Sequence, residues 1–278
     1  MTTRASSTTG DAAWSVAPAD ASGPDDRVSL RHELAPGEQV ADHVAVTNQS
    51  ASATTYSVVA GDGIVGANGA FDIRAGEAAD AGGWITVDGL DAGAITLEAG
   101  ETRVLPIGIA VPADATPGDH PAGIVVGVGS AEGDGVSVQT RVGVRLHLRV
   151  TGDVAAGLEL EQVGASFTPS WNPFAPGTLT VDYRIGNTGN VRVGSADRVT
   201  ATGPFAIAPT SGAAEPVHEL LPTDEVRRTV TVEAWPTGLL TGAVDGTPLV
   251  VGDDDWQAET AAVRTEFTVV ALAWWHAL

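Results

Sequence analysis

The stretch Arg141-Val-Gly-Val-Arg-Leu-His-Leu-Arg-Val150 alternates apolar and basic side chains with a period of two residues. Successive side chains of a β-strand point to opposite faces of the sheet, so this pattern predicts a strand with one apolar and one basic face. The apolar face is expected to pack on a second sheet, and the basic face to meet solvent or a partner. The apolar set is Val142, Val144, Leu146, Leu148 and Val150, and the basic set is Arg141, Arg145, His147 and Arg149.

A polar break, Thr151-Gly-Asp153, follows this strand, and a new series of strand-like runs begins at Leu158. We interpret the break as a domain junction. The 278 residues are enough for two domains that each bury a core. The predicted parts are a flexible N-terminus 1–10, a first β-sandwich 11–152, a second β-sandwich 153–272, and the start of a membrane anchor at 273–278.

The composition indicates the all-β class. The chain contains 34 Gly and 16 Pro, with Val and Thr throughout and few long amphipathic helical runs. Strands that recur at short spacing, separated by turns and without crossover helices, are typical of antiparallel sandwiches. We therefore predict two tandem immunoglobulin-like antiparallel β-sandwich domains.

Charge and chemistry exclude several function classes. The net charge is −21 and all 14 basic residues are Arg, a balance that disfavours nucleic acid and anionic lipid. The chain has no Cys, and its six His residues lack metal-ligand spacing. The sequence also lacks the common nucleophile, zinc-protease and phosphate-loop motifs. We expect no enzyme, no cofactor and no metal, although Asp253-Asp-Asp255 is either a solvated turn or a calcium ligand set.

The basic stripe is a candidate ligand site in the first domain. Carboxylates or phosphates of wall polymers can bind to Arg141, Arg145 and Arg149. The alternative is that acidic residues on neighbouring strands pair with them. Trp84 lies in the Gly/Ala/Asp-rich stretch 61–93, which is predicted to include a long loop, and either stacks on a sugar or plugs the end of the sandwich.

The second domain raises the same question at three residues. Asn172, Phe174 and Trp235 lie beside prolines and are candidate partner-binding residues, with turn and core roles as the alternative. The apolar run 269–278 contains paired tryptophans. It either begins a membrane helix at the lipid interface or only closes the last strand.

Several motifs occur in a fixed order along nearly the whole chain. They include Trp14-Ser-Val-Ala-Pro, the Leu34-Ala-Pro-Gly turn, Asp42-His-Val-Ala-Val-Thr-Asn48, Gly83-Trp-Ile85, Pro117-Gly-Asp-His120, Asn172-Pro-Phe174, Asn187-Thr-Gly-Asn-Val-Arg192, Glu219-Leu-Leu-Pro222 and Trp235-Pro236. Together they resemble the bacterial WxL-interacting protein family, formerly a domain of unknown function (DUF916), in an actinobacterial variety.

The resemblance implies a secreted, wall-associated and membrane-anchored protein of Gram-positive bacteria without catalytic residues. Its first domain is expected to bind peptidoglycan and its second a host ligand or surface protein, of WxL type or an equivalent. His120, in the Pro-Gly-Asp-His turn, joins the candidate ligand residues of the first domain. Two alternatives stay open: a chaperone-like tandem immunoglobulin protein that donates or accepts a strand during surface-fibre assembly, and a carbohydrate-binding accessory module.

Overall fold

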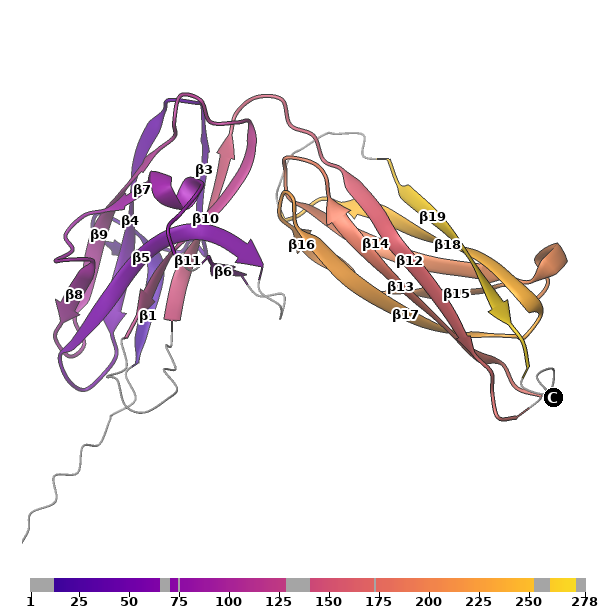
Figure 1. Cartoon of the computed structure of the whole chain (residues 1–278). Coiled ribbons are helices and arrows are strands. Elements are labelled where there is room, and N and C mark those ends of the chain that lie inside the picture. The colour runs from indigo at the N-terminus through magenta and orange to yellow at the C-terminus, as the bar shows by residue number, and fades with distance from the viewer. Residues whose placement is uncertain are drawn as a thin grey trace, which may run out of the picture. The chain divides into compact units, whose positions relative to one another are not determined.

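The computed structural model describes residues 13–65, 71–74, 76–128, 141–172, 174–252 and 261–273. The chain divides into two compact units, Met1–Gly152 (unit 1) and Asp153–Leu278 (unit 2). Both consist of β-strands, with only two short 3-10 turns among the described residues, so the all-β prediction is confirmed (Figure 1). Among the described residues, no helix has the length and apolarity needed to cross a membrane.

Unit 1 is a sandwich of two mainly antiparallel sheets. The first sheet has the order β2-β1-β4-β9-β7, and the second has the order β3-β11-β10-β5-β6, with β8 also pairing β5. The strands are β1 (Trp14–Asp20), β2 (Gly23–Pro24), β3 (Leu30–Leu34), β4 (Gln39–Asn48), β5 (Thr54–Val65), β6 (Phe71–Ile73), β7 (Ile85–Val87), β8 (Ala94–Leu97), β9 (Thr102–Ala110), β10 (Gly118–Gly127) and β11 (Arg141–Val150), and the 3-10 turn η1 (Ala81–Trp84) precedes β7.

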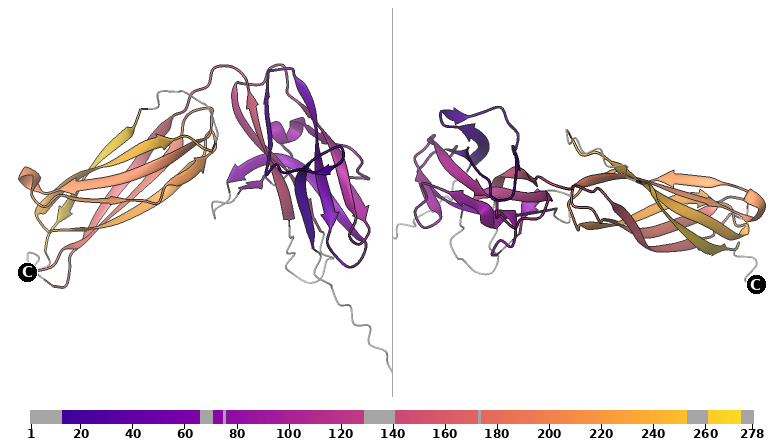
Figure 2. Two further views of the ribbon diagram at one scale, coloured as in Figure 1. Left: turned by 180° about the vertical axis from the view of Figure 1, so that it is seen from behind. Right: turned by 90° about the horizontal axis from the view of Figure 1, so that it is seen from above.

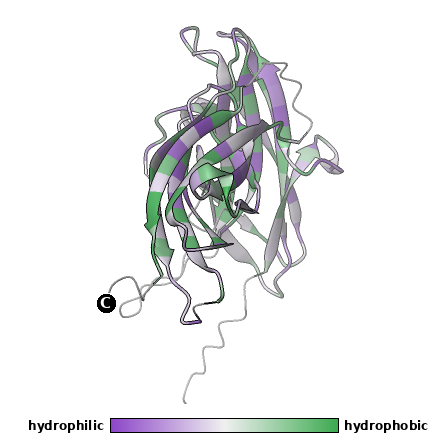
Figure 3. Cartoon of the chain, turned by 90° about the vertical axis from the view of Figure 1, so that its right-hand side faces the viewer, coloured by the Kyte–Doolittle hydropathy of each residue, from purple (hydrophilic) through white to green (hydrophobic). Residues whose placement is uncertain are grey.

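The alternation in β11 decides how unit 1 packs. Val144, Leu146, Leu148 and Val150 are buried in the core of the sandwich, while Val142, at the start of the strand, is 37% exposed. Figure 3 shows the same banding of apolar and polar positions along the strands. The predicted parity holds because one face of β11 packs on the opposite sheet.

Unit 2 also has two sheets, with the orders β12-β13-β17 and β15-β14-β18-β19, and β16 pairs β14. Its last strand contains residues 269–271, so that part of the apolar C-terminal run closes the sandwich; residues 274–278 lie outside the described residues. The elements are β12 (Leu158–Thr168), β13 (Gly177–Asn187), β14 (Val193–Thr202), η2 (Pro204–Ala206), β15 (Thr210–Ala213), β16 (Val217–Leu220), β17 (Glu225–Ala234), β18 (Gly238–Leu249) and β19 (Val263–Ala271).

A fully buried asparagine closes the turn after β4 in unit 1. The Asn48 side-chain amide donates hydrogen bonds to the carbonyl oxygens of Ser52 at 2.9 Å and Leu97 at 3.0 Å. The Tyr56 hydroxyl donates to its Oδ1 atom at 2.7 Å. Asn48 therefore ties the turn after β4 to β5 and to the distant end of β8, and it satisfies backbone groups that burial would otherwise leave unpaired.

Unit 2 uses an equivalent residue at the end of β13. The Asn187 side-chain amide donates to the carbonyl oxygens of Val191 at 2.8 Å and Leu220 at 3.0 Å. The backbone N–H of Gly189 donates to its Oδ1 atom at 2.9 Å. Gly189 has a negative φ, and a side chain there would collide with the carbonyl oxygen of Ala155, so close approach explains this glycine.

Replacing either asparagine by alanine is expected to destabilise only its own unit. Each change leaves buried carbonyl groups without a donor, so we expect Asn48→Ala and Asn187→Ala each to lower the free energy of unfolding by about 3 kcal/mol. Denaturant unfolding, followed by NMR signals assigned to each unit, measures the effect. A loss of less than about 1 kcal/mol in either unit contradicts this role.

Candidate functional site

The Asp62 carboxylate holds the η1 turn against the sheet that contains β5. Asp62, on β5, is 6% exposed and accepts hydrogen bonds from the backbone N–H groups of Ala79 at 2.7 Å and Gly82 at 2.8 Å. A side chain at Gly82 would collide with the backbone of β5. The segment before β7 is therefore pinned onto the sheet, where the sequence predicts a projecting loop.

His120 completes this attachment from β10. Its Nδ1 atom lies 2.8 Å from Asp80 Oδ1, and its Nε2 atom lies 2.8 Å from the carbonyl oxygen of Thr116. Both neighbours are acceptors, and only the doubly protonated imidazolium can donate to both at once. The His120 ring also packs on the Trp84 ring, with 4.8 Å between centroids.

These contacts determine the charge of His120. Burial of the ring opposes protonation, but the Asp80 carboxylate and the Thr116 carbonyl outweigh it, so the pKa of His120 is raised above its usual value. A raised folded-state pKa stabilises the protein below the unfolded-state value of about 6.5, and this stabilisation is lost as the pH rises through the folded-state pKa.

We therefore expect a pH-dependent stability of unit 1 that requires His120. The thermal unfolding temperature of unit 1 should fall between about pH 6 and pH 8 in the original chain, and His120→Gln should remove part of this slope. Substitution of the exposed His218 on β16 by Gln serves as the control. Equal slopes in the original chain and His120→Gln would contradict a protonated His120.

Trp84 and His120 are thus brought together, while Trp84 also packs against the core of unit 1. This packing favours the alternative in which Trp84 plugs the sandwich. The arginine stripe is also largely engaged. Arg149 Nε lies 2.6 Å from Asp119 Oδ1 on β10, and the Arg145 guanidinium lies 4.6 Å from the centre of the Phe71 ring.

The remaining stripe residue, Arg141, is exposed where β11 begins. On one side, β11 pairs with β10 along its whole length, from Arg141 to Val150. On the other side, β3 runs parallel to it but pairs only with residues 146–150. Strand β1 lies close to β11 but pairs with β4. Within the described part of the chain, the segment Arg141–Val144 is therefore paired in a ladder with one strand only, and we call it the β11 edge.

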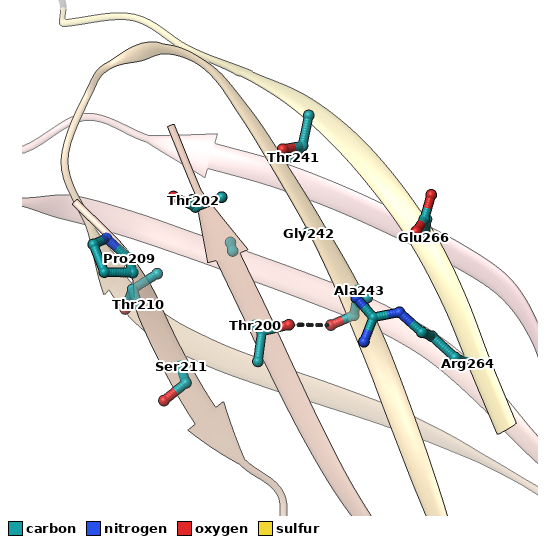
Figure 4. Close-up of a pocket in the computed structure, with 11 residues that line it drawn as sticks. Thr200, Thr202, Pro209, Thr210, Ser211, Thr241, Gly242, Ala243, Arg264 and Glu266 are labelled. Atoms are coloured by element: carbon teal, nitrogen blue, oxygen red, sulfur yellow. Dashed lines mark hydrogen bonds between the residues drawn. The ribbon is translucent and has the colours of Figure 1, made fainter. Parts of the chain in front are cut away.

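Unit 2 carries a groove of about 650 Å³ on the outer face of the sheet β15-β14-β18-β19 (Figure 4). Its floor is low because Ala243 carries only a methyl group between larger neighbours, and hydroxyl groups line much of its wall. Arg264 and Glu266 stand along one side, and Arg264 pairs with Asp245 at 2.9 Å. The hydroxyl-bearing residues are Thr200, Thr202, Thr210, Ser211 and Thr241. The groove suits a polar, uncharged chain.

The three candidate partner residues of unit 2 lie at one end of the sandwich. Strand register shows this, because Gly177 pairs with Ala234 where β13 begins and β17 ends, and Thr202 pairs with Thr241 where β14 ends and β18 begins. Loops 169–176, 203–209 and 235–237 therefore share this end, which we call the unit 2 tip. It contains the candidates Asn172, Phe174 and Trp235, together with Trp171 and Phe205, which the sequence analysis did not single out.

Asn172 builds the first of these loops. Its Oδ1 atom accepts a hydrogen bond from the backbone N–H of Phe174 at 3.0 Å, and its carbonyl oxygen accepts one from Ala175 at 3.1 Å. Asn172 thereby shapes the turn, and Phe174 is presented to solvent. As for metals, the described residues include no group of three or more His, Asp or Glu arranged to hold an ion, and Asp253-Asp-Asp255 lies outside them.

Comparisons with known proteins give solved structures with a similar arrangement of strands. One, from a chaperone–tip adhesin complex of CFA/I fimbriae, shares 10% identity over 91% of this chain and 98% of that chain, with a TM-score of 0.42. The class 5 fimbriae chaperone CfaA shares 11% identity over 87% of this chain and 96% of that chain, also with a TM-score of 0.42. The Escherichia coli chaperone DraB shares 9% identity over 93% of this chain and 99% of that chain, with a TM-score of 0.36.

No protein-family model matches the chain, and no curated protein matches it. The resemblance to the WxL-interacting family is thus untested by these comparisons.

Proposed function

We propose that this chain is a non-enzymatic bacterial cell-surface protein that binds an extended segment of another surface protein at the β11 edge. The observation that carries the proposal is the incomplete pairing of β11, since β3 covers residues 146–150 but not Arg141–Val144. An open edge offers backbone N–H and C=O groups to an added strand. The proposal makes unit 1 the acceptor.

Side chains at the β11 edge define which segment fits. Val142 is 37% exposed, and Arg141 is exposed beside it. An added strand would place alternate residues against these two side chains. A segment with a β-branched residue facing Val142 and a carboxylate facing Arg141 has complementary chemistry, in a protein whose net charge of −21 otherwise repels acidic partners.

Selection from a displayed library of random peptides on the full chain tests the proposal. Enriched peptides should combine β-branched and acidic residues. The charge reversal Arg141→Glu should lower the affinity for these peptides about three- to tenfold. Arg227→Glu, at an exposed arginine on β17 of unit 2, should leave the affinity unchanged.

Backbone pairing can be tested separately on one enriched peptide. A strand added to an edge turns alternate N–H groups toward that edge. N-methylation of one alternate set of peptide amides should therefore abolish binding, and methylation of the other set should preserve it. Equal binding by both methylated peptides would show that the peptide does not add as a strand.

The groove of unit 2 favours a second candidate function, which is binding of a wall glycan. The family resemblance assigns peptidoglycan binding to the first domain, but the described groove with suitable chemistry lies in unit 2. Its hydroxyl groups offer donors and acceptors to a sugar chain, and its volume of about 650 Å³ is in the usual range for ligand sites. Among the described residues that line it, none is an aromatic residue on which a sugar could stack.

Cosedimentation of the full chain with isolated peptidoglycan tests this candidate. Thr241→Trp fills the groove from its outward-facing floor position and should reduce the bound fraction to background. Thr247→Trp, at an exposed position further along the same strand, is the matched control. Sedimentation of both variants to the same extent as the original chain would rule out the groove as the glycan site.

A further inference from the structure

The unit 2 tip exposes aromatic rings to an unusual degree. Trp171 is 88% exposed, Phe174 is 87% exposed and Phe205 is 97% exposed, and each comes from a loop at the same end of the sandwich. Trp235, on the neighbouring loop, is 46% exposed. Large aromatic residues are normally well buried in soluble domains. Their concentration at one end therefore indicates a surface that a partner protein or a lipid bilayer covers.

The backbone of the η2 loop supports this interpretation. Phe205, Ala206 and Ala208 all adopt positive φ angles of 53° to 59°, a conformation that is unfavourable for residues other than glycine. Two hydrogen bonds hold this shape, from Gly203 N–H to the Ile207 carbonyl at 2.8 Å and from Ile207 N–H to the Pro204 carbonyl at 3.2 Å. The loop therefore holds Phe205 in solvent with an unfavourable backbone conformation. Such strain is typical of functional sites.

Charge is absent from the whole tip. The sequences 168–177, 199–214, 234–244 and 267–273 contain no Asp, Glu, Arg or His, in a chain with a net charge of −21. The charged residues that repel anionic surfaces therefore lie elsewhere. An uncharged aromatic end of this kind matches the interface of a bilayer, where Trp is enriched and charge is costly.

Two backbone N–H groups of the tip already have hydrogen-bond partners within their own loops. The Phe174 N–H is bonded to Asn172, and the Thr237 N–H is bonded to the Trp235 carbonyl at 2.9 Å. The three loops also contain prolines 169, 173, 176, 204, 209 and 236, which have no N–H to satisfy. A protein partner usually requires exposed hydrogen-bond donors and acceptors for specificity. A surface that enters lipid must instead have few donors and acceptors that lack a partner.

We propose that the unit 2 tip inserts its aromatic side chains into the interface of an uncharged lipid bilayer. Ala271, at the end of β19, pairs with Gly238 at the start of β18, so the end of β19 also lies at the tip (Figure 2). The exposed Leu239, Val270 and Leu272 continue the apolar surface next to it. This assignment gives Phe174 and Trp235 a lipid partner, and Asn172 the task of shaping their loop.

Flotation of the full chain with phosphatidylcholine vesicles tests the proposal. The chain should float with these vesicles, and added phosphatidylserine should weaken binding because of the net charge. Phe205→Ser and Trp171→Ser should each lower the partition coefficient about tenfold, as expected for loss of one buried aromatic side chain. Val28→Ser, at a 94% exposed valine of unit 1, should have no effect.

A second comparison separates the tip from the C-terminal tryptophans. In a variant with Trp274→Ser and Trp275→Ser, the tip should still bind vesicles, and brominated lipid should still quench its tryptophan fluorescence. The proposal is overturned if the original chain does not float, or if flotation depends only on Trp274 and Trp275. It is also overturned if the peptides enriched on the full chain require Phe205, since the tip is then a protein-binding surface.

Discussion

Most of the described strands pair their backbone groups in a sheet and bury one face in a sandwich core, and the rest of the structure depends on that constraint. The alternation in β11 meets it by placing Leu146 and Leu148 in the core and arginines on the outside. The buried Asn48 and Asn187 meet it where the chain turns out of a sheet. Because apolar side chains fill the interior of each sandwich, the surfaces available for binding are strand edges, outer sheet faces and loops.

The three features with functional potential correspond to these three places. The β11 edge is a half-completed ladder, the groove is a low region of an outer sheet face, and the unit 2 tip is a set of loops. Each has different chemistry, because the edge offers backbone groups and arginine, the groove offers hydroxyl groups, and the tip offers aromatic rings without charge.

Periodicity in the sequence was sufficient for the fold class and for the buried face of β11, because side-chain parity is a local property of the backbone. Periodicity does not predict contacts between segments that are distant in sequence. Nothing in the stretch 61–93 indicates that Asp62 would pin Gly82 onto β5, or that His120 would bridge Asp80 and Thr116. The pairing of Arg149 with Asp119 was foreseen only as an alternative, since it depends on strand register.

The candidate residues of unit 2 show the same limit. Flanking prolines mark Phe174 and Trp235 as candidates in the sequence. The sequence does not mark Trp171 and Phe205 as exposed, because aromatic residues are buried more often than exposed. Their exposure depends on loop geometry, including the positive φ angle of Phe205. The signal that could have identified them is the lack of charge in all three loops of such an acidic chain.

Hydrogen–deuterium exchange of the free chain, resolved to single amides by NMR, tests the central claim that β11 keeps an open edge. If β3 covers only residues 146–150, amides there should all be protected, whereas protected and rapidly exchanging amides should alternate along Arg141–Val144. Uniform protection from Arg141 to Val150 would show that the edge is already covered, and would contradict the account of this protein as one that accepts a strand.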